Sequence, residues 1–426
     1  MTTQMIITLI IVLIMIAMII SDKFAFGAPP LIACVLLVLT GVSTIQDAFG
    51  GFIDSNVVMI ACFMVILGAF QKTTLIGKIK QGMNAMTTKG GFKNYILMLL
   101  AVLLCANLIS GTGFYVLVLT LAATIPYNKK LPVSKILMPL GFATAYGGFI
   151  PITAAVMTGI AASVLESSGF PQANVSILDY AVVRGAMALA FFIWALIGYR
   201  FLPDRPIASD SNLIQKTDDE QAETLPRWKE ICIYIALGVT VIGLIFLSQL
   251  GDVGYIIPAA AVVFLFVTGC ISFKETRETL SSPLILMLAG VIGVANTMSS
   301  CGLTALVGNA VANALGNNAS PFMIVLLFSA LTSIFACFTG ASFGSLFIFA
   351  PIAISACMAM GYDPTGVAVA LTMSAWINWF MPIDGLPAMI MGLGNYKLTE
   401  IWKFSIPLYI VTIIVMSAAT TLVFPV

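Results

Sequence analysis

The residues best suited to do chemistry lie in the stretch 380–387, FMPIDGLP, which interrupts a long apolar segment. Its two prolines and its glycine disfavour a continuous helix, because proline removes a backbone donor and glycine loosens the chain. Non-helical backbone at membrane depth is tolerated only where protein buries it or where it lines a watery cavity. Asp384 is the one acidic residue expected deep in an apolar segment. It has two interpretations: it carries a proton or a sodium ion, or it caps the helix that follows.

Three other stretches repeat this kind of interruption. In the first half of the chain, 151–155 (PITAA) aligns with the proline stretch at 382, and 110–113 (SGTG) aligns with 339–342 (TGAS) in the same order. Small residues let an apolar run reverse as a hairpin whose tip exposes hydroxyls and backbone groups to a solute or an ion. The alternatives are close helix packing at the tips and simple proline kinks at the other two stretches.

These four stretches supply the predicted site. The predicted solute-binding residues are Ser110, Gly111, Thr112, Gly113, Thr153, Thr339, Gly340, Ala341, Ser342 and Asn378. The predicted ion-coupling residues are Asp384, Gly385, Ser110, Thr153 and Ser342.

Three further polar residues in apolar segments have alternative interpretations. Arg184 either binds an anion, or extends its side chain to the membrane interface, or pairs locally, for instance with Asp179 or Asp54. Asn378, just before the broken stretch, either lines the same cavity or bonds between packed helices. Asn107, near the first predicted tip, is a weaker candidate of the same kind.

The composition predicts a membrane protein of the all-α class. Of the 426 residues, 60% are hydrophobic and 9% are charged, with a mean hydropathy of +1.07, whereas soluble domains have about 25% charged residues. Histidine is absent, the eight cysteines show no metal-binding spacing, and no nucleophile lies beside a base. The chain is therefore not expected to be an enzyme or to carry a cofactor or a metal beyond a coupling sodium ion. Its net charge of +1 gives no reason to expect a nucleic-acid partner.

The basic residues predict how the chain lies in the membrane. If 94–126 and 321–359 are re-entrant hairpins, then of the 19 Lys and Arg residues only Arg184 falls outside the side that holds the polar linker 203–228. The positive-inside rule makes this side cytoplasmic and both termini external. Each half then has five transmembrane helices and one hairpin, which makes the second half an inverted repeat of the first.

The order of elements resembles the divalent anion:sodium symporter (DASS) family of the ion transporter superfamily. The resemblance is strongest at 382–387, followed by 391–398 (MGLGNYKL) and 403–407 (KFSIP), and 47–52 (DAFGGF) also resembles a family element. Family members carry Ser-Asn-Thr at each hairpin tip, and this chain lacks both asparagines. The resemblance implies a homodimer in which a transport domain moves against a scaffold domain as an elevator.

The expected domains follow from the repeat and from this resemblance. They are scaffold of repeat 1 (1–75), an interfacial arm helix (76–93), transport domain of repeat 1 (94–202, with the hairpin 94–126 and the broken helix 134–165), linker (203–228), scaffold of repeat 2 (229–300), an external arm helix (301–320) and transport domain of repeat 2 (321–426, with the hairpin 321–359 and the broken helix 364–392).

These features predict a secondary active transporter in the cytoplasmic membrane. Its expected partners are the lipid bilayer, a second copy of the chain and a small solute, an anion such as a carboxylate, with Na⁺ or H⁺ as the coupling ion. The alternatives are a cation/proton antiporter that uses Asp384, and a membrane partner protein that transports nothing.

Overall fold

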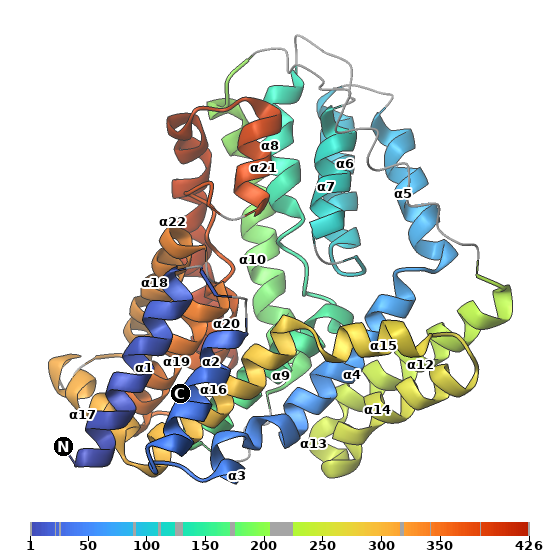
Figure 1. The fold of residues 1–426 in the computed structure, drawn as a ribbon. Helices are drawn as coiled ribbons and strands as arrows, with labels where there is room; N and C mark the ends of the chain where they lie inside the picture. The colour runs from blue at the N-terminus through green and yellow to red at the C-terminus, as the bar shows by residue number, and fades with distance from the viewer. Residues whose placement is uncertain are drawn as a thin grey trace.

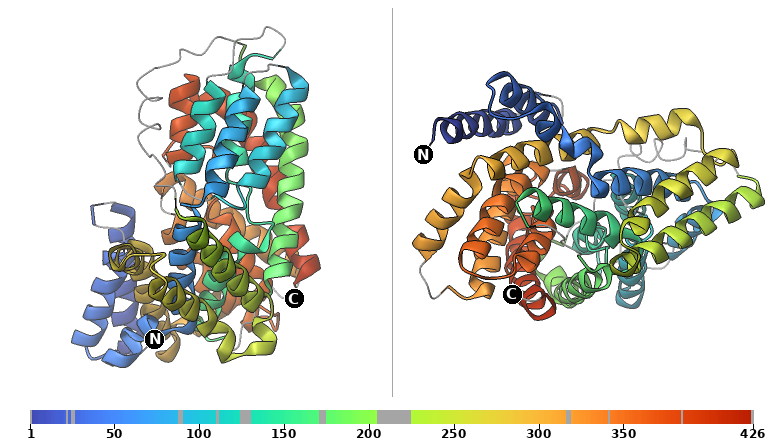
Figure 2. Two further views of the ribbon diagram at one scale, coloured as in Figure 1. Left: turned by 90° about the vertical axis from the view of Figure 1, so that its right-hand side faces the viewer. Right: turned by 90° about the horizontal axis from the view of Figure 1, so that it is seen from below.

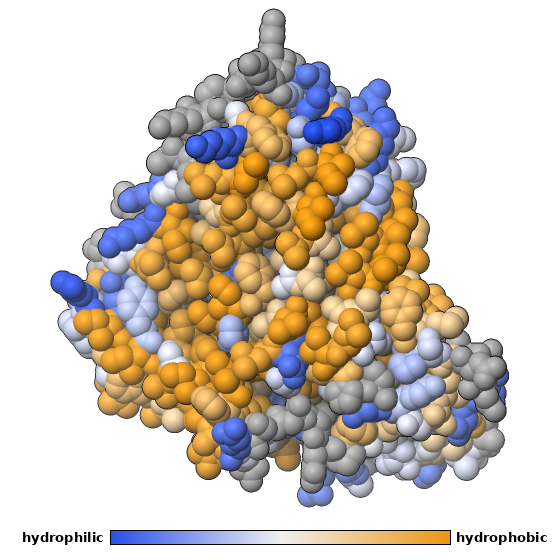
Figure 3. All heavy atoms as spheres, turned by 180° about the vertical axis from the view of Figure 1, so that it is seen from behind, coloured by the Kyte–Doolittle hydropathy of each residue, from blue (hydrophilic) through white to orange (hydrophobic). Residues whose placement is uncertain are grey.

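The computed structural model describes residues 2–21, 23–24, 27–87, 91–109, 112–123, 131–170, 175–204, 225–315, 319–340, 342–383 and 385–424. Within these ranges the regular structure is entirely helical, without a strand. Six of the described helices are long and apolar enough to cross a membrane. Large apolar side chains cover most of the face in Figure 3. An apolar surface of this extent suits lipid rather than water, so the chain is an all-helical polytopic membrane protein.

The first half of the chain runs through twelve described elements (Figure 1). They are α1 (Thr3–Ser21), α2 (Ala28–Leu39), α3 (Ile45–Ala48), η1 (Gly50–Ile53), α4 (Ser55–Phe70), α5 (Thr74–Thr87), α6 (Phe92–Cys105), α7 (Thr112–Ala123), α8 (Val133–Ala143), α9 (Pro151–Ser167), α10 (Ile177–Gly198) and η2 (Tyr199–Phe201).

The second half follows the same plan with eleven described elements. They are α12 (Arg227–Ile245), α13 (Leu247–Leu250), α14 (Asp252–Val267), α15 (Phe273–Leu280), α16 (Pro283–Ser300), α17 (Leu303–Leu315), α18 (Pro321–Thr339), α19 (Ser342–Ala359), α20 (Thr365–Ser374), α21 (Gly385–Gly394) and α22 (Leu398–Val423).

Short polar residues and glycine set several of the helix ends. Asp54 caps α4 by accepting from the backbone N–H groups of Asn56 and Val57, and Ser176 and Ser320 cap α10 and α18 in the same way. Such caps satisfy donors that the first helical turn leaves free. At the other end of α18, Gly340 has a φ of 70°, a left-handed conformation that favours glycine and ends the helix.

Several helices of the first half pack on helices of the second half. Helix α2 of the first half packs on α16 of the second, and α4 of the first packs on α14 of the second. The same holds for two consecutive helices of the first half, since α8 packs on α21 and α9 packs on α20 of the second half (Figures 1 and 2). An inverted repeat produces this crosswise pairing when its two copies close on each other.

Two glycines allow α16 to approach the short elements α3 and η1 of the other half. A Cβ atom at Gly51 would collide with the backbone of Ala289, and one at Gly293 would collide with the backbone of Ala48. Neither obstacle is a side chain that could rotate away. Small residues let helices in membranes approach at backbone distance, and here glycine is required on both sides of the contact.

Candidate functional site

Each half contains one long apolar segment that breaks into two helices. Helix α8 ends at Ala143 and α9 begins at Pro151, whereas α20 ends at Ser374 and α21 begins at Gly385. We call 144–150 the first loop and 375–383 the second loop. Pro151 occupies the first turn of α9, where its missing N–H costs no hydrogen bond. Backbone groups in these loops need partners from elsewhere in the protein.

Two side chains provide those partners for the first loop. The buried Asn107 lies beyond the end of α6, and its Oδ1 accepts from the backbone N–H groups of Gly148 at 2.9 Å and Ile150 at 3.0 Å. Arg184 of α10 donates from Nε to the carbonyl of Gly147 at 2.8 Å and from Nη2 to that of Ala145 at 2.8 Å. An acceptor from one element and a donor from another therefore fix the non-helical backbone between them.

This arrangement corrects the interpretation of Arg184. The sequence favoured a side chain that extends to the membrane interface or pairs with a local partner such as Asp179 or Asp54, with an anion as the alternative. Instead, the guanidinium bonds to loop carbonyls, a role that the fixed fork of arginine donors suits well. Asn107, the weaker candidate in the sequence, supports the loop rather than pairing one regular helix with another.

The second loop is held by the hairpin of its own repeat. The buried Asn378 donates from Nδ2 to the Oγ of Ser342, the first residue of α19, at 3.3 Å. Phe343 meets Trp376 edge-on with ring centroids 4.7 Å apart. From the other side, the indole N–H of Trp402 in α22 donates to the carbonyl of Phe380 at 2.7 Å. Asn378 therefore links the second loop to the start of α19, and its role in solute binding stays a prediction.

The two loops also meet each other. Tyr146 of the first loop and Trp379 of the second have ring centroids 5.0 Å apart at an interplanar angle of 46°. Both side chains are almost fully buried, at 1% and 4% exposure. Tyr146 also stacks on Phe191 of α10 and pairs its hydroxyl with that of Thr412 in α22 at 2.7 Å. Aromatic side chains therefore hold the first and second loops together in the protein core.

The structure describes most of the predicted site residues but not all of them. Thr153 lies in the first turn of α9, and its buried Oγ1 has no hydrogen-bond partner among the described residues. Thr339 bonds its hydroxyl to the carbonyl of Phe335 in its own helix at 2.8 Å. Thr112 and Gly113 are the first two residues of α7, and Gly385 is the first residue of α21. Four predicted residues lie outside the described part: Ser110, Gly111, Ala341 and Asp384.

Two pairs of helices from opposite repeats pack on each other. Helix α19, which begins at the second hairpin turn, packs on α9, which begins at the first loop, while α7 packs on α21 in the same manner. Helix N-termini present free N–H groups and partial positive charge. With the hydroxyls of Thr153 and Ser342, this arrangement is chemically suited to a small anion.

The sequence analysis missed two features. One is the aromatic contact between the two loops, and the other is a polar group at the start of α4. Tyr146 and Trp379 look like ordinary apolar core residues, and no pattern in the sequence pairs them. The second group is formed by Asp54, Asn56 and Glu166. A signal for it existed, because the acidic residues stand in stretches, 43–54 and 166–178, that contain no basic residue.

The sequence profile of the citrate transporter family, CitMHS, matches residues 11–319, which is most of the chain. The chain belongs to the citrate transporter family. The finer resemblance to the DASS family stays a prediction. Members of the family are transporters and not enzymes, and the two curated relatives described next are also named transporters.

Two curated relatives of this citrate transporter family member have no assigned substrate in their names. The uncharacterized transporter YfbS of Escherichia coli is 23% identical over 69% of this chain and 45% of its own length. The uncharacterized transporter sll0640 of Synechocystis is 25% identical over 36% of this chain and 25% of its own length. The chain therefore spans less than half the length of these curated relatives.

Two solved structures share the fold. The YdaH transporter of Alcanivorax borkumensis superposes with a TM-score of 0.60 at 14% identity, covering 88% of this chain and 85% of that one. MtrF of Neisseria gonorrhoeae superposes with a TM-score of 0.61 at 15% identity, covering 91% and 83%. At such identities the likeness concerns the fold of a membrane transporter.

Proposed function

We propose that the chain is a secondary active transporter that moves a small carboxylate anion across the cytoplasmic membrane. The observation that carries this proposal is the meeting of the two loops through Tyr146 and Trp379. Helices α9 and α19 pack on each other, and Thr153 and Ser342 belong to their first turns, which supports a binding site shared by both repeats. The family description names citrate, which makes a carboxylate the preferred solute class.

The proposed mechanism is an elevator in a homodimer. Regions 1–75 and 229–300 act as the scaffold, and regions 94–202 and 321–426 move with the solute. Helix α9 packs on both α4 and α16, so these contacts are where the two domains slide past each other. Both termini are external and the linker 203–228 is cytoplasmic. Na⁺ or H⁺ provides the driving force, with Asp384 as the proposed coupling group.

Uptake by purified protein in liposomes tests the site. We expect Thr153→Ala and Ser342→Ala each to lower the initial rate of citrate uptake about tenfold, which corresponds to ~1.4 kcal/mol of lost stabilisation of the bound solute. The matched control is Thr421→Ala, because among the described residues the Thr421 hydroxyl bonds to carbonyls of its own helix α22. It should transport at the wild-type rate.

The assay also separates the competing functions. Uptake is measured with sodium gradients, with proton gradients and with neither, and a citrate-induced rise in melting temperature reports binding. A chain that exchanges protons for cations without binding citrate would replace this proposal with the antiporter. A chain that binds no anion and moves no ion would replace it with a partner protein.

A further inference from the structure

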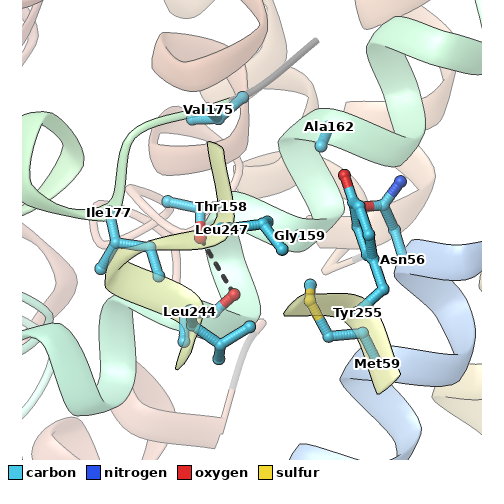
Figure 4. A pocket seen from close by; sticks show the side chains of 11 residues that line it. Asn56, Met59, Thr158, Gly159, Ala162, Val175, Ile177, Leu244, Leu247 and Tyr255 are labelled. Carbon is cyan, nitrogen blue, oxygen red and sulfur yellow. Dashed lines mark hydrogen bonds between the residues drawn. The ribbon is translucent and has the colours of Figure 1, made fainter. Parts of the chain in front are cut away.

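Three helices, α4, α12 and α14, pack on one another and run between two chemically different ends. At one end, Asn56 of α4, Leu244 of α12 and Tyr255 of α14 line a small pocket (Figure 4). The charged groups next to Asn56 are acidic: Asp54 caps α4, and Glu166 accepts from the Asn56 amide. Like charges repel, so this end of the three helices disfavours an anion.

The opposite end of the same helices is basic. The Nζ of Lys229, in the first turn of α12, donates to the carbonyl of Gly269 just beyond α14 at 2.6 Å. The ring of Phe273, the first residue of α15, meets that of Phe266 in α14 edge-on. These contacts bring the starts of α12 and α15 to the end of α14. The basic side chains of these two starts, which we call the basic corner, are Arg227, Lys229, Lys274 and Arg277.

Two of the acidic side chains at this end are already bonded to the first half of the chain. Glu230 of α12 is 7% exposed and accepts from the backbone N–H of Thr74 at 2.6 Å and from its hydroxyl at 3.0 Å. Glu275 of α15 pairs with Lys72 at 2.9 Å. Glu278 is the remaining acid of α12 and α15. The ion pairs found among the described residues involve no member of the basic corner, which therefore keeps an excess of positive charge.

The basic corner lies where the lipid-facing surface of α12 ends. Exposed apolar side chains follow one face of this helix at intervals of three or four residues: Ile231, Ile235, Val239 and Ile242. On a membrane helix such a stripe faces the acyl chains. Trp228 precedes the stripe at 53% exposure, and Phe273 of α15 is 69% exposed. Exposed aromatic rings beside basic side chains are typical of the level of the lipid headgroups.

We infer that the basic corner binds the phosphate group of an anionic phospholipid. Guanidinium and ammonium groups are common protein ligands of phosphate, and arginine matches its geometry. The acyl chains of the same lipid lie along the apolar stripe of α12. A lipid is favoured over a free anion because the positive charge adjoins the stripe, so one molecule satisfies both. The inference concerns the outer surface of the protein and does not rest on the proposed transport function.

Binding of a fluorescent phosphatidylglycerol to the purified full chain in a zwitterionic detergent tests this inference. Each basic residue near an anionic lipid contributes about fivefold in affinity. We therefore expect Arg227→Gln to weaken binding about fivefold, and the double variant Lys274→Gln/Arg277→Gln about 25-fold. The matched control is Lys93→Gln/Lys403→Gln, which removes the same charge from exposed residues of α6 and α22. It should bind the lipid like the wild type.

The melting temperature in lipid nanodiscs gives a second readout. Adding phosphatidylglycerol to phosphatidylcholine should raise the melting temperature of the wild type and of the control, because a ligand that binds the folded state stabilises it. The double variant on α15 should melt like the wild type in phosphatidylcholine alone, which shows that it folds, and should gain nothing from phosphatidylglycerol. High salt should weaken the binding.

Three outcomes would overturn the inference. If phosphatidylcholine competes as well as phosphatidylglycerol, the surface binds acyl chains without recognising the headgroup. If inorganic phosphate displaces the lipid as well as free phosphatidylglycerol does, the corner is a site for a free anion. If the control variant loses as much affinity as the variant on α15, the attraction comes from the net charge of the protein and not from this corner.

Discussion

Replacing Asn107 by alanine is expected to destabilise the protein by roughly 2–6 kcal/mol and to abolish transport. The reason is that the N–H groups of Gly148 and Ile150 both lose their acceptor in a buried place, and each unsatisfied group costs about 1–3 kcal/mol. Chemical denaturation in detergent measures the first effect, and citrate uptake in liposomes measures the second.

The matched substitution is Asn107→Asp, which keeps an oxygen in the position of Oδ1. It should retain more stability than the alanine variant, since the two backbone donors keep an acceptor. If both variants lose stability equally, the contact to the first loop is not the cause. If Asn107→Ala melts and transports like the wild type, then the first loop does not need this acceptor.

Replacing Gly293 by alanine is expected to destabilise the protein by at least about 1–3 kcal/mol, the usual cost of overpacking. The added Cβ would collide with the backbone of Ala48, so a whole element of the other half must move rather than one side chain. The measurement is again the midpoint of chemical denaturation, and the fraction of protein that elutes as a single species reports folding.

Two helical glycines provide the control for this effect. Gly68 in α4 and Gly238 in α12 have no atom within 4 Å of the position that a Cβ would take. Alanine at these sites should be neutral or stabilising by ~0.5–1 kcal/mol, because alanine restricts the unfolded chain and favours helix. Equal losses at Gly293 and Gly68 would show that the close contact between α16 and α3 does not determine stability.

The sequence could predict the helix breaks because their cause is local. Proline and glycine in an apolar run interrupt a helix wherever the run happens to pack, so the breaks at Pro151 and before Gly385 follow from residue type. The elements on either side could be predicted from the same apolar pattern. The inverted repeat itself could be predicted from the span count and the matched stretches, whereas the packing of helices of one half on helices of the other depends on the closed structure.

The partners of the loops could not be predicted, because they depend on packing between distant segments. Nothing around Arg184 distinguishes a guanidinium that bonds backbone carbonyls from one that binds an anion. The polar group of Asp54, Asn56 and Glu166 was missed for the same reason: Asp54 caps α4 and Glu166 lies in α9, and each acid alone resembles an ordinary interfacial residue. The role of Asp384 stays a prediction, since this residue lies outside the described part.

The contact between Tyr146 and Trp379 also has a consequence for biogenesis. The tyrosine leaves the ribosome long before its partner, because one ring belongs to the first half and the other comes near the end of the chain. Until the second half is synthesised, the first half therefore lies in the membrane with the Tyr146 ring lacking its partner. Exposed apolar surface of this kind promotes misassembly. A truncated chain would keep this surface, and membrane quality-control proteases could recognise it as incomplete.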